Sequence, residues 1–242
     1  AVESSVYNDT IDHEIRVMEG PQASIKNINI SGNDKTKEYV IRREIRTIPG
    51  EKFSRSDLIR TQRELANLGY FDQEKLGVNP KPNPQDGTVD IEYVVEERPS
   101  DQIELSGGWG AGQIVGTLGV TFNNFSGKNI FKKGAWTPLP SGDGQRLSVR
   151  AQTNGKYFQS YSASFTEPWL GGKKPNSLSV STYYSIQTNG KKKTDITRQS
   201  LNIVGVSVGL GQRLRVPDDF FNIYHELNFQ HYILDNYTTS FL

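Results

Sequence analysis

The sequence predicts two structural parts in one chain. The first is a small α+β domain with the element order β-α-α-β-β, and the second is the N-terminal part of an antiparallel transmembrane β-barrel. Two stretches with helical spacing of apolar residues occur before residue 98. After Arg98-Pro99-Ser100 this spacing ends, and alternating segments follow one another to the end of the chain. Several of these are close to the roughly 9 to 11 residues that a tilted strand needs to cross a membrane.

Composition excludes several classes of protein. The 242 residues contain 28 Lys and Arg and 27 Asp and Glu, so the net charge of +1 gives no reason to expect a nucleic acid partner. The absence of cysteine excludes disulfides, thiolate chemistry and cysteine-ligated metals. No stretch approaches the roughly 18 consecutive apolar residues of a transmembrane helix. The hydrophobic share of 34% does not exclude a barrel, because its strands need apolar residues only at every second position.

The first part can be read element by element. Residues 1–20 contain one alternating run, at 11–17, which we interpret as the C-terminal strand of a preceding domain. Residues 21–98 form the next domain, with a strand from residue 23 and a first helix at about 36–46. Since the chain begins without methionine and its final residues resemble the middle of a strand or loop, we interpret it as a piece of a longer mature protein.

The second helix of this domain has the clearest end signals. Ser54 opens it, with Asp57 in the position of an acidic capping box, and Gly69 is suited to a left-handed C-terminal residue. A strand is expected near 75–79, a turn at 80–87 and a final strand at 88–96.

A family resemblance rests on four motifs of this domain. They are Ile28-x-Ile30-x-Gly32-Asn33, Val40-Ile41-Arg42-Arg43-Glu44-Ile45, Leu65-x-x-Leu68-Gly69-Tyr70-Phe71 and Val89-Asp90-Ile91-x-Tyr93-x-Val95-x-Glu97. Their order and spacing resemble the polypeptide-transport-associated (POTRA) domain over nearly the whole of residues 23–98. The resemblance implies that residues 21–98 are a membrane-proximal POTRA domain and that residues 1–20 are the tail of another.

The second part, residues 99–242, is expected to contain about seven barrel strands. Alternating runs lie at 102–110, 113–122, 146–153, 158–165, 177–188, 200–212 and 220–234. In the last run, Leu227 and Phe229 share one face and Glu226 and Asn228 the other, as expected for a wall between lipid and water. A soluble β-sandwich is the alternative, because its strands also alternate.

A POTRA domain directly followed by barrel strands resembles the family of central subunits of the machinery that inserts β-barrel proteins into bacterial outer membranes. The segments 123–127 and 165–170 resemble the periplasmic turns of that family. This implies a non-enzymatic insertase without a cofactor, with its barrel in the outer membrane and its POTRA domain in the periplasm. The implied partners are accessory outer-membrane lipoproteins, unfolded outer-membrane protein clients and outer-membrane lipid.

Two other functions remain open. A polypeptide-exporting translocase of the same superfamily would have fewer POTRA domains upstream. A passive porin or structural anchor would conduct ions or tether the membrane without taking part in assembly.

The first barrel strand is the main candidate site. We expect its pairing with the last strand to be weak, because glycines are concentrated at one end and supply no side chain for packing. The seam between the first and the last strand would act as a lateral gate. When it opens, the edge of the first strand would template an incoming strand. The alternative is that the glycines serve only the tight turn that follows. The edge consists of Gln102, Ile103, Glu104, Leu105, Ser106, Gly107, Gly108, Trp109 and Gly110.

Two further segments are candidate partner sites. Arg42, Arg43 and Glu44 are expected on the exposed side of the first helix, and the resemblance implies that Arg43 and Glu44 contact an accessory lipoprotein. A solvated helix face is the alternative. The long turn 123–145 carries Lys132, Lys133 and Trp136 and is expected to contact a partner or fold over the barrel rim.

Enzymatic and metal chemistry find little support. His13 lies far along the sequence from His225 and His231, which share one face of the last predicted strand and are interpreted as ordinary strand residues rather than ligands. The glycine-rich segment 108–112 precedes no helix that could present its N-terminus to a phosphate. Gly142-Asp143-Gly144 is a turn signal that lacks the further ligands of a calcium loop.

Overall fold

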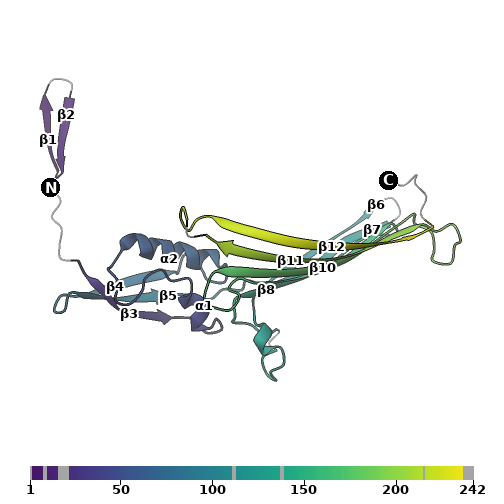
Figure 1. Ribbon diagram of the computed structural model, residues 1–242, viewed down its shortest axis with the longest axis horizontal. Coiled ribbons are helices and arrows are strands. Elements are labelled where there is room, and N and C mark those ends of the chain that lie inside the picture. Colours follow the sequence, from purple (N-terminus) through teal and green to yellow (C-terminus); the bar gives the residue numbers. More distant parts are fainter. Residues whose placement is uncertain are drawn as a thin grey trace.

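The computed structural model describes residues 2–7, 10–15, 22–110, 113–136, 139–214 and 216–236, with side chains from His13 onward. Three separate sheets follow one another along the chain (Figure 1). The first is a hairpin of β1 (Val2–Tyr7) and β2 (Thr10–Ile15). The alternating run predicted at 11–17 overlaps β2, and its last two residues lie outside the described ranges. β1 was not predicted, and the origin of residues 1–20 in a preceding POTRA domain stays a prediction.

The second sheet and two helices form the α+β domain. Its strands are β3 (Ser24–Ser31), β4 (Gly77–Asn83) and β5 (Thr88–Val94), in the spatial order β3-β5-β4. β5 runs parallel to β3 and antiparallel to β4. Helices α1 (Glu38–Arg42) and α2 (Arg55–Asn67) bury apolar side chains against the sheet, and the order β-α-α-β-β is confirmed. The core includes Ile28, Val40, Ile41, Leu65, Phe71, Ile91, Tyr93 and Val95.

The helix signals read from the sequence are largely correct. Ser54 Oγ accepts a hydrogen bond of 3.4 Å from the amide of Asp57, and Gly69 has a φ of +83°. α1 is shorter than the expected 36–46. It ends early because the amide of Arg46 donates to Thr61 Oγ1 at 3.0 Å on α2, so this amide does not continue the helical hydrogen bonds.

The turn expected at 80–87 was placed too early. β4 continues through Pro80 and Pro82 to Asn83, and both prolines pair in register with β5. Since β4 is an edge strand, it needs amide donors on one side only. The two prolines occupy alternate positions, so the side that lacks N–H groups is the one that faces away from β5.

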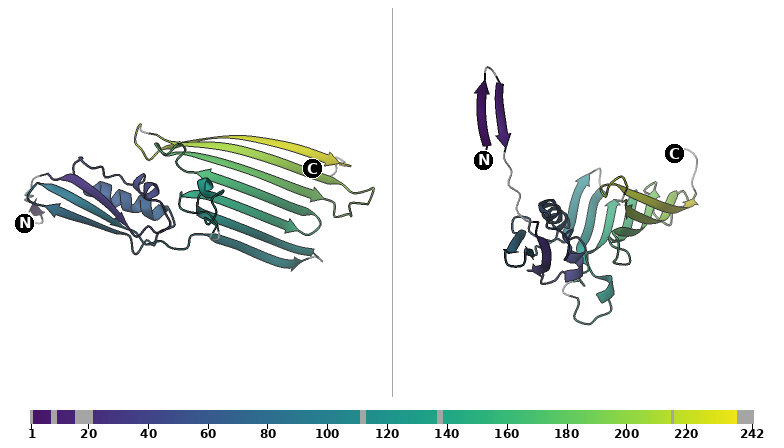
Figure 2. Two further views of the ribbon diagram at one scale, coloured as in Figure 1. Left: turned by 90° about the horizontal axis from the view of Figure 1, so that it is seen from below. Right: turned by 60° about the vertical axis from the view of Figure 1, so that its left-hand side comes forward.

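The third sheet contains seven antiparallel strands joined in chain order (Figure 2). The strands are β6 (Gln102–Gly110), β7 (Gln113–Phe125), β8 (Gln145–Asn154), β9 (Phe158–Glu167), β10 (Asn176–Thr188), β11 (Ser200–Arg213) and β12 (Asn222–Asp235). All seven coincide with predicted runs. The turn between β6 and β7 includes residues 111–112, which lie outside the described ranges.

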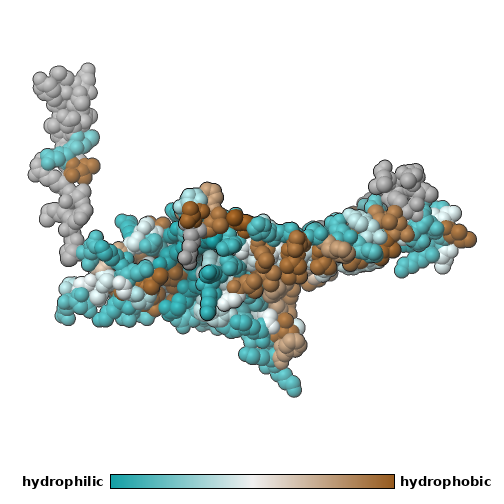
Figure 3. All heavy atoms as spheres, in the orientation of Figure 1, coloured by the Kyte–Doolittle hydropathy of each residue, from teal (hydrophilic) through white to brown (hydrophobic). Residues whose placement is uncertain are grey.

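The register gives this sheet two chemically different faces. Leu105 lies opposite Leu118, which lies opposite Ala151, and the same face continues through Tyr161 and Tyr184. Much of this apolar face is exposed, and Figure 3 shows apolar residues along the sheet. The opposite face carries Glu104, Ser106, Thr117, Thr121, Ser148, Arg150 and Gln152.

The predicted alternation is therefore present across the whole sheet. In the described part of the chain no second sheet covers the apolar face, as a soluble sandwich would require. None of the described helices is long and apolar enough to span a membrane.

Candidate functional site

The predicted edge strand β6 lies at one border of the large sheet. Its nine residues, Gln102–Gly110, pair with β7 along their full length, and all nine are exposed. On its other side no described strand pairs with its backbone. β6 and β12 are therefore the two border strands of the described sheet, and strand addition takes place at the border of a sheet.

The glycines of β6 are not demanded by local geometry. Gly107, Gly108 and Gly110 are absent from the residues with positive φ, so an L side chain would fit their backbone conformation. A Cβ at Gly107 or Gly108 would come no closer than 3.8 or 3.7 Å to its neighbours, and at Gly110 it would meet nothing within 4 Å. The tight turn alone does not explain these three glycines, which favours a role for them in weak strand pairing.

A charged pair lies over the polar face beside this edge. Arg150 Nη2 on β8 donates to Glu104 Oε1 on β6 at 2.9 Å, although β7 runs between the two strands. Gly119 of β7 lies between their backbones in register. A Cβ at Gly119 would approach Glu104 Oε2 to 3.3 Å and Arg150 Cγ to 3.6 Å. The glycine thus leaves the space in which the pair meets.

A second region of interest is the junction between the α+β domain and the nearer rim of the large sheet. Trp169, in the turn after β9, donates from Nε1 to Glu44 Oε1 at 2.7 Å. The guanidinium carbon of Arg43 lies 5.6 Å from the centroid of the same indole. Burial raises the pKa of the Glu44 carboxyl, although the Trp169 hydrogen bond and the charge of Arg43 act in the opposite direction.

This geometry corrects the expected exposure of the charged cluster. Arg42 is exposed as expected, but the side chains of Arg43 and Glu44 are only 7% and 10% exposed. The prediction was wrong because a turn 125 residues further along the chain covers this side of the domain. Contact of an accessory lipoprotein with Arg43 and Glu44 stays a prediction, and it requires that the domain first move away from the sheet.

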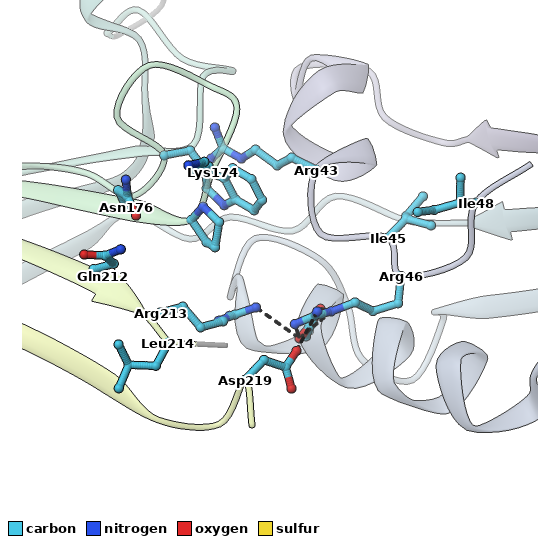
Figure 4. Close-up of a pocket in the computed structure, with 13 residues that line it drawn as sticks. Arg43, Ile45, Arg46, Ile48, Lys174, Asn176, Gln212, Arg213, Leu214 and Asp219 are labelled. Carbon is cyan, nitrogen blue, oxygen red and sulfur yellow. Dashed lines mark hydrogen bonds and ion pairs between the residues drawn. The ribbon is translucent and has the colours of Figure 1, made fainter. Parts of the chain in front are cut away.

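A network of ion pairs continues the junction on α2. Arg46 forms an ion pair of 2.8 Å with Glu64, and both Arg46 and Arg60 reach Asp219, in the turn before β12, at 2.7 Å. Arg213 at the end of β11 approaches Glu64 at 3.6 Å. A cleft of about 670 Å³ lies between the domain and the rim, and its lining includes Arg46, Glu64, Arg213, Asp219 and Trp169 (Figure 4). No local sequence pattern indicated this network, because its members come from four separate segments.

The turn Gly142-Asp143-Gly144 forms the third part of the junction. Lys37 Nζ, Tyr39 Oη at 2.7 Å and Ser126 Oγ at 2.6 Å all donate to the buried carboxylate of Asp143. Burial alone would raise the pKa of this carboxyl, but these three donors together hold it below the ordinary value. The amide of Lys37 also donates to the carbonyl of Gly142 at 3.0 Å. The predicted turn is therefore a docking turn for α1.

The remaining predicted residues lie at the tip of the long turn between β7 and β8. Lys132 and Lys133 are exposed, and Trp136 is 53% exposed. They follow the short 3₁₀ helix η1 (Gly127–Asn129) and do not contribute to the junction. Residues 137–138 of the same turn lie outside the described ranges. Among the residues whose positions are described, no cluster of three or more His, Cys, Asp or Glu could hold a metal ion.

Two family models match the chain. Residues 23–98 match POTRA, described as a surface antigen variable number repeat, and residues 141–241 match the Omp85 superfamily domain. Fold and matches together define the class, which is a POTRA domain followed by an antiparallel sheet that matches the Omp85 superfamily domain over residues 141–241. Within that class, the chain is similar to proteins named outer membrane protein assembly factor BamA.

The curated relatives are much longer than this chain. The BamA of Neisseria meningitidis serogroup B is 28% identical over 208 residues, which are 86% of this chain and 24% of that protein. The BamA of Neorickettsia risticii is 34% identical over 122 residues, which are 50% of this chain and 16% of that protein.

Solved structures show the same fold. Haemophilus ducreyi BamA lacking POTRA domains 1–3 matches 98% of this chain and 41% of its own, with a TM-score of 0.66 and 22% identity. CdiB from Acinetobacter baumannii matches 89% of this chain and 39% of its own, with a TM-score of 0.53 and 15% identity. The POTRA domain and the barrel-like sheet predicted from the sequence are confirmed.

Proposed function

We propose that this chain is part of an outer-membrane insertase, in which β6 acts as an edge that templates strands of incoming β-barrel proteins. The observation that carries the proposal is that β6, a border strand of the described sheet, contains three glycines that local geometry does not require. An incoming strand can pair with such an edge through its main chain, whatever its side chains are. Similarity to assembly factors supports the same function.

Weak pairing makes such an edge usable. An unpaired backbone group in lipid costs several kcal/mol, so a closed barrel resists opening unless its seam is weak or a new strand replaces the lost partner. Glycines at positions 107, 108 and 110 reduce side-chain packing along the far half of β6. The proposed cycle opens the seam beside β6, pairs a client strand with it and releases the client when its own strands close.

We also propose where the parts of the protein lie and what they bind. The apolar face of the large sheet would meet outer-membrane lipid, and the POTRA domain would lie in the periplasm. The proposed domain limits are 1–20 for the end of a preceding POTRA domain, 21–98 for this one and 99–242 for the first barrel strands. Accessory lipoproteins and unfolded clients are the proposed protein partners, and no enzymatic step is proposed.

A translocase of the same superfamily is the second candidate, because the fold of CdiB is also similar. At 15% identity this similarity concerns the fold alone. Depletion of the protein distinguishes the two functions. An insertase defect lowers the amounts of many outer-membrane barrels, whereas a translocase defect affects one exported polypeptide.

Disulfide locks in the full-length protein test the insertase directly. Cysteine pairs that join Leu105 or Gly107 of β6 to the last barrel strand should abolish insertion of a client barrel into vesicles, and reductant should restore it. A matched lock between Ser164 and Ser181, which face each other on β9 and β10, should leave insertion unchanged. Normal insertion by the oxidised β6 locks would exclude templating at this edge.

A further inference from the structure

The turn between β7 and β8 has a buried base and an exposed tip. At the base, Ser126 donates to Asp143, and the amide of Gly127 donates to Gln145 Oε1 at 2.6 Å. At the tip, Phe131 is 96% exposed although the surrounding backbone is held by hydrogen bonds, including one of 3.0 Å from Lys132 to Asn129. The structure thus holds a large apolar side chain away from the protein.

The tip combines aromatic and basic side chains. The indole Nε1 of Trp136 donates to the carbonyl of Ile130 at 2.9 Å, so its one polar group is satisfied inside the turn. The exposed remainder of the ring offers mainly apolar surface. Lys132 and Lys133 lie between the two aromatic residues in sequence, and no described acidic group forms an ion pair with either one. Two aromatic rings beside unpaired lysines are typical of a surface that meets lipid headgroups.

The position of the tip fits the same partner. Phe125, at the base, packs edge-to-face on Phe165 with ring centroids 6.4 Å apart, and Phe165 belongs to the apolar face of the large sheet. Figures 1 and 2 both show the teal turn projecting from one side of the sheet, at the end next to the POTRA domain. Apolar residues cover the sheet beside it in Figure 3. The tip therefore extends the apolar face sideways at the rim where a membrane would end.

We infer that residues 128–136 form a membrane-interface anchor, in which Phe131 and Trp136 insert among phospholipid headgroups and Lys132 and Lys133 contact their phosphates. The inference rests on the proposed placement of the sheet in an outer membrane. It goes beyond that placement because it gives the long turn a lipid partner in the periplasmic leaflet. Such an anchor fixes the height of β7 and β8, and hence of β6, relative to the bilayer.

Fluorescence quenching by nitroxide-labelled lipid tests this inference in the full-length protein. The protein is placed in phosphatidylethanolamine and phosphatidylglycerol vesicles that carry shallow nitroxides, with a fluorophore on Ala135→Cys in the tip. Lys173→Cys, in another turn at the same rim, is the exposed control, and Leu118→Cys, on the apolar face, is the lipid control. The probe at 135 should be quenched at least about threefold more strongly than the probe at 173.

Two variants in the Ala135→Cys background test the named side chains. Phe131→Ser with Trp136→Ser should reduce quenching to the level of the probe at 173. Lys132→Glu with Lys133→Glu should remove the increase in quenching that phosphatidylglycerol causes in the parent. A probe at 135 that stays unquenched while the probe at 118 is quenched overturns the anchor and leaves the membrane placement intact; the tip would then be available to a protein partner. If the probe at 118 is also unquenched, the membrane placement itself is wrong.

Discussion

Trp169 and Glu44 are joined by a hydrogen bond of 2.7 Å from the indole Nε1 to the carboxylate Oε1, across 125 residues of sequence. The contact links the turn after β9 to the residues that follow α1, so it holds the POTRA domain against the rim of the sheet. Because the carboxylate is largely removed from water, the bond matters more than an exposed one would. The position of the domain therefore depends on a few buried polar contacts.

Replacing Trp169 by phenylalanine tests this contact. The change keeps a ring beside Arg43 but leaves the Glu44 carboxylate without its donor, which should weaken docking by about 1 to 3 kcal/mol. The amide of Lys37 reports on docking, because its acceptor is the carbonyl of Gly142 on the sheet side. Hydrogen exchange at this amide should accelerate about fivefold or more. Trp109→Phe on β6, far from the junction, is the control and should leave the rate unchanged.

Acidification should tighten the junction through Glu44. Burial raises the pKa of this carboxyl above 4.5 in the docked state, so docking binds a proton in the interval between 4.5 and the raised pKa. The docking free energy thus becomes more favourable as pH falls from neutral through that interval, and it is constant above it. Exchange at Lys37, corrected for intrinsic pH dependence, measures the effect. Glu44→Gln should abolish this dependence, and an unchanged profile in that variant would assign the pH effect to another group.

Asp143 should act in the opposite direction at lower pH. Its hydrogen bonds with Lys37, Tyr39 and Ser126 hold its pKa below 3.8, so its contribution is complete above 3.8 and is lost as pH falls through the lowered pKa. Asp143→Asn should weaken docking at neutral pH. It should also remove the loss of docking free energy that Asp143 causes as pH falls through its lowered pKa. Hydrogen exchange at the Lys37 amide measures both effects. If the variant keeps the parent exchange rate at neutral pH and the parent increase at low pH, the role of Asp143 is contradicted.

Local signals were sufficient to predict most elements of the fold. The Ser54 cap, the left-handed Gly69 and the alternation in all seven sheet strands depend on residues close together in sequence, so periodicity and turn chemistry were enough. The turn predicted at 80–87 was placed too early because proline is a turn signal unless its strand lies at the edge of a sheet, as β4 does. Edge position follows from the order of strands in space, which the local pattern does not contain.

The candidate site was predicted less completely than the fold. β6 was chosen as the candidate because it is the first strand after the domain boundary and is rich in glycine, and its role as a templating edge stays a prediction. The burial of Glu44 was missed because an isolated helix face with three charges is normally solvated, and the group that covers it comes from a distant turn. One signal was present, since an indole in the polar turn Glu167-Pro168-Trp169 has no local core to enter and must pack elsewhere.

Gly32 and Gly50 provide a matched pair for the stability of the POTRA domain. Their φ angles are +89° and +90°, but a Cβ at Gly32 would overlap the carbonyl oxygen of Val95, whereas at Gly50 it would meet nothing within 4 Å. Gly50→Ala should cost about 1 to 2 kcal/mol from backbone strain alone. Gly32→Ala should cost at least about 2 kcal/mol more, because β5 or the turn must shift. Exchange of the buried Leu65 amide on α2 measures both, and equal losses would show that the overlap relaxes without cost.

The pair of Glu104 and Arg150 should restrain the edge strand before any client binds. Both side chains are about half exposed, so the pair is worth at most about 1 kcal/mol. Glu104→Arg places two positive charges over Gly119 and should raise amide exchange along Gln102–Gly110 about two- to fivefold. The double variant Glu104→Arg with Arg150→Glu should restore the parent rate of amide exchange, because it rebuilds the ion pair with the charges reversed. If the double variant exchanges as fast as the single one, side-chain packing at Glu104 restrains the strand and the charge pair does not.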